Sequence, residues 1–201
     1  MASFTKRVAL LAAAGTLTVG TLAACSNTTE SSMPGMDHKA TPMTSSATAG
    51  ASVDAKDGDV RFAQMMIPHH QQAIEMADVA LSKPSASEKV KELSADIKKA
   101  QDPEIATMRG WLSSWGAQTS MPPGMDHGSG MMSADDMDKL KAAEGAAFDR
   151  TWITQMISHH EGAVTMAEQV LATTQNPEVK QLAEAIIKAQ KAEIATMQSL
   201  L

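Results

Sequence analysis

Four stretches of the chain place apolar residues three and four positions apart, which is the period of an amphipathic helix. They predict helices over roughly 59–82, 86–114, 146–174 and 177–200. Only 3% of the residues are aromatic, whereas Ala and the 16 Met residues are plentiful, which favours helices over a β-sandwich or barrel. We therefore expect an all-α chain.

The region 57–201 contains an internal duplication. Phe62–Leu81 matches Trp152–Leu171 at an offset of 90 residues, and Val90–Leu112 matches Val179–Leu201 at an offset of 89. Each copy therefore holds two helices joined by a short connection. Two tandem helical hairpins of one duplicated unit predict a four-helix bundle with a pseudo-twofold axis.

Short signals mark where the expected helices begin. Ser85-Ala-Ser-Glu88 fits a capping box, and Asn176-Pro177 fits an N-cap followed by proline at the first helical position. Ser133-Ala-Asp-Asp136 predicts a short extra helix before the second hairpin. Pro68 and Pro103 fall inside expected helices and should kink them. Because their counterparts in the other copy are not proline, both helices should continue past these points.

The first 24 residues have the pattern of a secretion signal. Lys6 and Arg7 are followed by an apolar run, Val8–Ala24, that is too short for a membrane-spanning helix. The run ends in Leu22-Ala-Ala-Cys25, which resembles a bacterial lipobox, so the single Cys is expected to carry lipid. An ordinary cleaved signal with a chance Cys is the alternative. We expect a protein outside the cytoplasm, attached to a bacterial membrane through Cys25.

The remaining organisation follows from composition. Residues 25–56 are rich in Ser, Thr, Ala and Met and predict a flexible tether. The bundle over 57–201 divides into repeat one (57–115), a Met/His loop (116–132) and repeat two (133–201). Without Lys6 and Arg7 the 17 basic residues become 15 against 23 acidic ones, a net charge of −8. This balance argues against nucleic-acid binding.

Two His-His pairs occupy duplicated positions on the expected helices. His69 and His70 lie on the two shoulders of one apolar arc, and His159 and His160 repeat the arrangement. Adjacent residues point about 100° apart on a helix, so each pair should address two different neighbouring helices. The four histidines are candidate metal ligands. The alternative is that they are core histidines satisfied by hydrogen bonds.

A carboxylate lies in the middle of each apolar seam on the other two helices. Glu104 follows Val90, Leu93, Ile97 and Ala100 on one seam, and Glu193 takes the same position beyond Ala189 on the other. A buried carboxylate is costly unless it is paired or binds a metal. Either it binds metal directly, it orients a ligating His, or it forms a Glu–His pair that serves stability alone. By level along the helices, His69 is the expected neighbour of Glu104.

Methionine suggests which metal would bind. Imidazole suits Zn, Cu, Fe and Ni, whereas thioether sulfur selects Cu(I). Six methionines are duplicated and face inward: Met66, Met76, Met108, Met156, Met166 and Met197. A Met stripe on a helix also fills a core. Other Met and His residues lie in polar stretches with no core to fill, and these predict an auxiliary copper-binding segment or a Met-rich contact surface: Met33, Met36, His38, Met43, Met121, Met125, His127, Met131 and Met132.

The motif Met-Ile-x-His-His-x-x-Ala-x-x-Met-Ala occurs at 66–77 and again at 156–167. It resembles the family of the domain of unknown function 305, over about 57–201. The resemblance implies a ferritin-like four-helix bundle, secreted or membrane-anchored. Some members of the family are associated with extracytoplasmic copper binding and resistance. That association would carry to His69, His70, His159 and His160 and to the motif methionines.

Three functions fit these observations. The first is a lipoprotein that sequesters copper, as Cu(I) or Cu(II), or hands it to a copper exporter or a cuproprotein. The second is a ferritin-like di-metal oxidase, which needs Glu-x-x-His on two helices. Met66 and Met156 stand three residues before His69 and His159, so the motif is absent and an enzyme is not expected. The third is a structural lipoprotein that docks a partner. The oligomeric state is left open.

Overall fold

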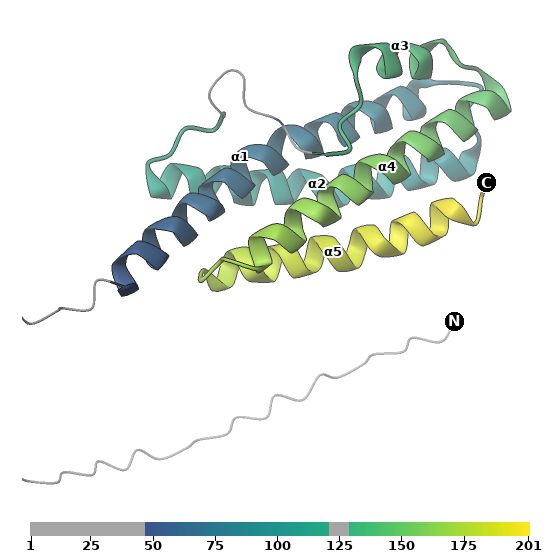
Figure 1. Ribbon diagram of the computed structural model, residues 1–201. Coiled ribbons are helices and arrows are strands. Elements are labelled where there is room, and N and C mark those ends of the chain that lie inside the picture. Colours follow the sequence, from purple (N-terminus) through teal and green to yellow (C-terminus); the bar gives the residue numbers. More distant parts are fainter. Residues whose placement is uncertain (1–46, 121–128) are drawn as a thin grey trace, which may run out of the picture. The chain divides into compact units, whose positions relative to one another are not determined.

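The computed structural model describes residues 47–120 and 129–201, with side chains from residue 56 onward (Figure 1). Within these residues the chain is entirely helical, as expected. The helices are α1 (Ala47–Ser82), α2 (Glu88–Trp115), α3 (Ala134–Ala142), α4 (Gly145–Leu171) and α5 (Pro177–Gln198). The prediction of an all-α helical bundle is confirmed.

The helices form two hairpins that meet through their first members. α1 packs along α2, α4 packs along α5, and the hairpins touch mainly where α1 meets α4. The short helix α3 lies against α4 at one end of the bundle. There the Lys83 ammonium, just after α1, donates to the carbonyls of Lys141 and Ala143 at 3.0 and 2.7 Å. α3 is thus fastened beside the turn between α1 and α2.

The buried side chains form two clusters, one on each side of the bundle centre. The first joins the middle of α1 to the end of α4, and the second joins the end of α1 to the beginning of α4, so these two helices are antiparallel. Residues related by the duplication fall in opposite clusters. Met66 lies in the first cluster and its counterpart Met156 in the second, and Met166 and Met76 are divided in the same way. This exchange is what a pseudo-twofold axis between α1 and α4 requires.

Most of the predicted helix signals are confirmed, and one is corrected. The Asn176 side chain caps α5, with Pro177 at its first position, and Ser133 with Asp136 forms a capping box on α3. The helices run through Pro68 and Pro103. The N-cap of α2, however, is Ser87, whose hydroxyl accepts from the Val90 N–H at 3.3 Å.

Ser85, the expected cap, is used elsewhere, because its hydroxyl donates to the Glu144 carboxylate before α4. Ser87, two residues closer to the helix, serves as the cap, because Ser85 makes a tertiary contact instead. Local pattern alone does not separate two serines so closely spaced.

The first helix begins earlier than its pattern indicates. α1 starts at Ala47, so the last ten residues of the predicted tether over 25–56 are helical. Residues 47–58 contain several Ala, which favours helix, but they carry no apolar stripe, so periodicity gave no signal there. Among the helices of 47–120 and 129–201, none combines the length and hydropathy of a membrane span.

Candidate metal centre

The four predicted histidines lie together between the two apolar clusters, and we call this group the histidine layer. His69, His70 and His160 are fully buried, and His159 is 1% exposed. The residues of each pair diverge as the helical geometry predicts. His69 of α1 and His159 of α4 face each other across the pseudo-twofold axis, while the second histidine of each pair turns toward its own hairpin partner.

The outer histidines each hold a carboxylate. The His70 Nε2–H donates to Glu104 Oε2 at 2.7 Å, and the His160 Nε2–H donates to Glu193 Oε2 at 2.8 Å. The carboxylates keep 20% and 22% of their side chains exposed, so they lie at the rim of the bundle. Glu104 therefore pairs with His70 and not with His69, because His69 is turned toward α4.

The inner histidines form the centre of the layer. The ring centroids of His69 and His159 are 3.7 Å apart, with an interplanar angle of 40°. Burial, followed by the charge of the nearby His70, lowers the pKa of His69 to about 3. Burial, followed by the charge of His69, holds the pKa of His159 well below its usual 6.5. Both rings are neutral at pH 7, and a neutral imidazole is the form that binds metals.

Each imidazole of the layer has a buried nitrogen without a hydrogen-bond partner. These atoms are Nδ1 of His69, His70 and His160, and Nε2 of His159. Carboxylate and carbonyl oxygens only accept, so Nε2 carries the hydrogen wherever it bonds Glu104, Glu193 or the Ser129 carbonyl. In the neutral ring this leaves Nδ1 as an unprotonated lone pair. Buried polar atoms are rarely left unpaired in folded proteins, and a bound ion often satisfies those that lack a protein partner.

The predicted methionines surround this layer. All six are buried, and each half of the duplication gives three of them. Met66, Met108 and Met166 belong to the first apolar cluster, and Met76, Met156 and Met197 to the second. They fill the core on both sides of the histidines. Because Met66 and Met156 stand one helical turn before His69 and His159, their thioethers lie on the same helix faces as the inner rings.

The layer differs from a carboxylate-based metal centre. In the described part of the chain no three His, Cys, Asp or Glu side chains gather closely enough to hold a metal ion. Besides the imidazole nitrogens, the donor atoms that the duplicated motif places on the same helix faces are the thioether sulfurs of Met66 and Met156. That donor set is soft and suits Cu(I) better than Zn, Fe or Mn.

Most of the predicted auxiliary ligands lie outside the described residues. These are Met33, Met36, His38, Met43, Met121, Met125 and His127. Cys25, the predicted lipidation site, also lies outside the described residues. Met131 and Met132 are described, and both are half-buried. Met132 packs against the second apolar cluster, so the expectation that these loop methionines have no core to fill is wrong for this residue.

The structure also buries a glutamine pair that the seam pattern did not predict. Gln101 and Gln190 are each 3% exposed, and the Oε1 atom of each has no partner. Their neighbours Ala100 and Ala189, which the seam pattern placed inward, are exposed. The duplication of Lys-Ala-Gln in both copies could have indicated that the glutamine is buried. The apolar pattern instead assigns the core position to alanine, because glutamine is polar.

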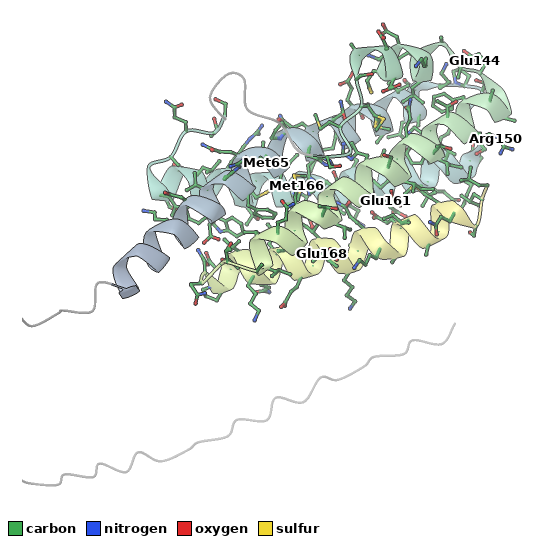
Figure 2. All side chains as sticks on the ribbon, in the orientation of Figure 1. Met65, Glu144, Arg150, Glu161, Met166 and Glu168 are labelled. Atoms are coloured by element: carbon green, nitrogen blue, oxygen red, sulfur yellow. The ribbon has the colours of Figure 1, made fainter. Side chains whose placement is uncertain are left out.

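Met65 is a further residue that the sequence pattern missed, because its counterpart in the other copy is Gln155. Figure 2 shows Met65 on α1 close to Met166 on α4, and both line one surface pocket with Arg61 and Phe62. Met166 therefore reaches from the first apolar cluster to the molecular surface.

Comparison with known proteins places this geometry in a family. The family model for the domain of unknown function DUF305 matches residues 59–201. A DUF305 protein from Streptomyces coelicolor, whose name describes it as secreted, is similar in structure, with a TM-score of 0.67 and 32% identity; the match covers 72% of this chain and 91% of that one.

A second similar structure is CopM in its Cu(I)-bound form, with a TM-score of 0.60 and 37% identity over 71% of this chain and 94% of that one. CopM has also been solved with Cu(II) and with silver. A curated relative, the uncharacterized protein L153 of Acanthamoeba polyphaga mimivirus, is 42% identical over 53 residues. That match spans 26% of this chain and 35% of the relative.

Proposed function

The chain belongs to the DUF305 family, and from that premise we propose that it is an extracytoplasmic copper-binding lipoprotein. Copper is its cargo, held by the imidazoles of the histidine layer and the neighbouring thioethers. The protein sequesters the metal or hands it to a copper exporter or a cuproprotein.

The observation that carries the proposal is the set of four imidazole nitrogens that are buried in one layer without a protein partner. A purely structural layer would leave four desolvated polar atoms without compensation, each at a cost of about 1–3 kcal/mol. Ligation by a soft cation removes that cost. Glu104 and Glu193 would then act by orienting His70 and His160, since each carboxylate already accepts from the Nε2–H.

The relatives support copper as the metal. CopM binds Cu(I), Cu(II) and silver, and it shares more than a third of its residues with this chain over the bundle. Silver is a soft monovalent ion like Cu(I), and thioether with neutral imidazole is the donor set that such ions prefer. The extracytoplasmic location is supported by the lipobox-like sequence before Cys25 and by the name of the Streptomyces relative.

Binding is favoured over oxidase chemistry by the residues that flank the histidines. A ferritin-like oxidase uses Glu-x-x-His, and here Met stands three residues before both inner histidines. The two carboxylates nearest the layer are engaged by His70 and His160.

Metal analysis tests the proposal directly. The purified protein is exposed to a mixture of Cu, Zn, Fe and Mn under reducing and under oxidising conditions, and the retained metals are measured. We expect copper to be retained in preference to the others, most strongly under reducing conditions. Retention of two irons per chain would support the oxidase, and no retained metal would support a structural role.

Paired variants locate the site. Met66→Leu combined with Met156→Leu removes two thioethers while keeping the side-chain volume, so the fold should survive. We expect the affinity for Cu(I), measured by competition with a chelator, to fall at least about tenfold, equivalent to about 1.4 kcal/mol. Met137→Leu is the matched control, because Met137 is buried in the second cluster but lies on α3, outside the duplicated motif. Equal affinities in both variants would place the copper elsewhere.

A further inference from the structure

One short segment crosses the bundle beside the inner histidines. This segment, Ser129–Met132, begins in the sequence directly after residues 121–128 and leads into α3 (Figure 1). We call it the strap. Its first carbonyl, that of Ser129, accepts from the His69 Nε2–H at 3.3 Å. Ser129 is exposed, whereas His69 is fully buried. At this point an exposed residue is hydrogen-bonded directly to a buried ring of the histidine layer.

The strap lies directly on the backbone of α4. A Cβ atom on Gly162 would come within 1.9 Å of the Ser129 oxygen, and one on Gly130 within 2.7 Å of the Ser158 carbonyl oxygen. Neither position has room for a side chain, and Gly130 also has a positive φ of 88°. The strap thus reaches His69 only because two glycines let the two backbones touch.

The other end of the strap is held by α1. The Gln72 amide donates to the Met132 carbonyl at 2.8 Å and accepts from the Met132 N–H at 2.7 Å. Beyond the strap, α3 is fixed in turn, since the Gln155 amide donates to the Asp136 carbonyl at 3.0 Å. Two hydrogen bonds from Gln72 and one from His69 therefore bind the strap to α1.

Gln72 and Gly162 are counterparts in the duplication. The surrounding histidines, alanines and methionines match between the copies, but this position differs, and both residues contact the strap. A single strap that passes beside a pseudo-twofold axis cannot meet both halves in the same way. In one copy Gln72 hydrogen-bonds the strap, and in the other copy Gly162 leaves room for the strap backbone.

We propose that the strap is the access and positioning element of the metal centre. It keeps His69 in the Nε2–H tautomer, so that Nδ1 presents its lone pair within the layer, and it must leave before a soft monovalent cation can reach the inner histidines. Gln72 and Gly162 are its positioning residues. This inference rests on the proposed function, because it names what controls the same site.

Two variants loosen the strap by independent routes. Gly162→Ala drives it off α4 while favouring helix, and Gln72→Ala removes two hydrogen bonds without adding bulk. The matched controls are Gly110→Ala, where a Cβ meets nothing within 4 Å, and Gln71→Ala, on the exposed neighbour of Gln72. Circular dichroism confirms that each variant is folded.

The first readout needs no metal. Diethyl pyrocarbonate modifies accessible imidazoles, and its rate at His69 is followed by peptide mass spectrometry. We expect about tenfold faster modification in Gly162→Ala and Gln72→Ala, and no change in the controls. Nitrogen NMR should show loss of the fixed Nε2–H tautomer of His69 in the same two variants. Unchanged modification and an unchanged tautomer in both variants would overturn the proposal.

The second readout is the rate of silver uptake. We expect the two strap variants to take up Ag(I) about tenfold faster than the controls. Faster modification of His69 with unchanged uptake would mean that the metal reaches the layer by another route, which also overturns the proposal. If no variant and no wild-type protein binds silver or copper, the proposed function fails, and the modification and NMR data still decide whether the strap covers His69.

Discussion

The two hairpins of this protein match at the histidine layer and differ where they meet the strap. The outer pairs are nearly identical, with His–Glu distances of 2.7 Å in the α1–α2 hairpin and 2.8 Å in the α4–α5 hairpin. At positions 72 and 162, by contrast, the hairpins carry Gln and Gly. The matched positions are those that meet at or around the pseudo-twofold axis. Gln72 and Gly162 both touch a segment that exists only once.

The comparison assigns different physical roles to the two kinds of position. A residue that must meet its own counterpart, as His69 meets His159, is subject to the same packing on both sides. A residue that contacts a segment present only once has no such constraint, so its counterpart in the other copy can differ. The difference between Gln72 and Gly162 is therefore explained by the strap, and the match of the four histidines is explained by the pseudo-twofold axis.

The inner pair gives the largest expected effect in the metal-free protein. Because the pKa values of His69 and His159 are lowered in the folded state, the unfolded chain binds protons below the ordinary value of 6.5 that the folded chain does not, and for His69 this window extends down to about pH 3. Stability should therefore fall as the pH falls through this window, by up to about 1.4 kcal/mol per pH unit for each histidine.

Urea denaturation at a series of pH values measures this slope, and His69→Gln combined with His159→Gln is the comparison variant. The slope should be much shallower in the double variant. The same slope in both proteins would mean that other groups cause the acid sensitivity.

Core truncation in either hairpin comes next. Trp152 and Phe62 are counterparts in opposite apolar clusters, and both are buried. Replacing either with Ala should lower the free energy of unfolding by about 3–5 kcal/mol. Trp152→Ala should cost more, because the side chain is larger and its indole N–H donates to the Met76 carbonyl at 3.1 Å. Equilibrium denaturation gives both values, and a larger loss for Phe62→Ala would contradict the assignment.

Removing the carboxylates tests the symmetry itself. Glu104→Ala and Glu193→Ala should each cost about 1–3 kcal/mol, because each leaves a buried imidazole N–H unpaired. The two losses should agree within about 0.5 kcal/mol and should add in the double variant, since the pairs lie on different hairpins. Unequal losses in denaturation experiments would show that the two halves are not equivalent in energy.

The smallest effect concerns the helix caps. Ser87→Ala and Asn176→Ala remove the N-caps of α2 and α5, and each should cost about 1 kcal/mol. Ser85→Ala removes a contact with Glu144 at the surface and should cost less than about 0.5 kcal/mol. Thermal denaturation of the three variants checks the order of these losses in stability. A larger loss for Ser85→Ala than for Ser87→Ala would indicate that Ser85 is the N-cap of α2, as the sequence predicts.

The sequence by itself determined the helices, the duplication and the identity of the buried histidines. Each of these follows from local period or from self-similarity, because apolar spacing alone decides which face of a helix is buried. The divergence of His69 and His70 was predictable for the same reason, as adjacent residues point in fixed, different directions on a helix.

Only the tertiary structure decided which partners those residues meet. The choice of His70 over His69 for Glu104, the burial of Gln101, and the contact of Ser129 with His69 depend on the rotation and crossing of packed helices. The helical period predicts which face of a helix is buried, but not which of two adjacent residues on that face meets a given partner. The strap depends in addition on the close approach of two backbones, and Gly162 reports such an approach only by lacking a side chain.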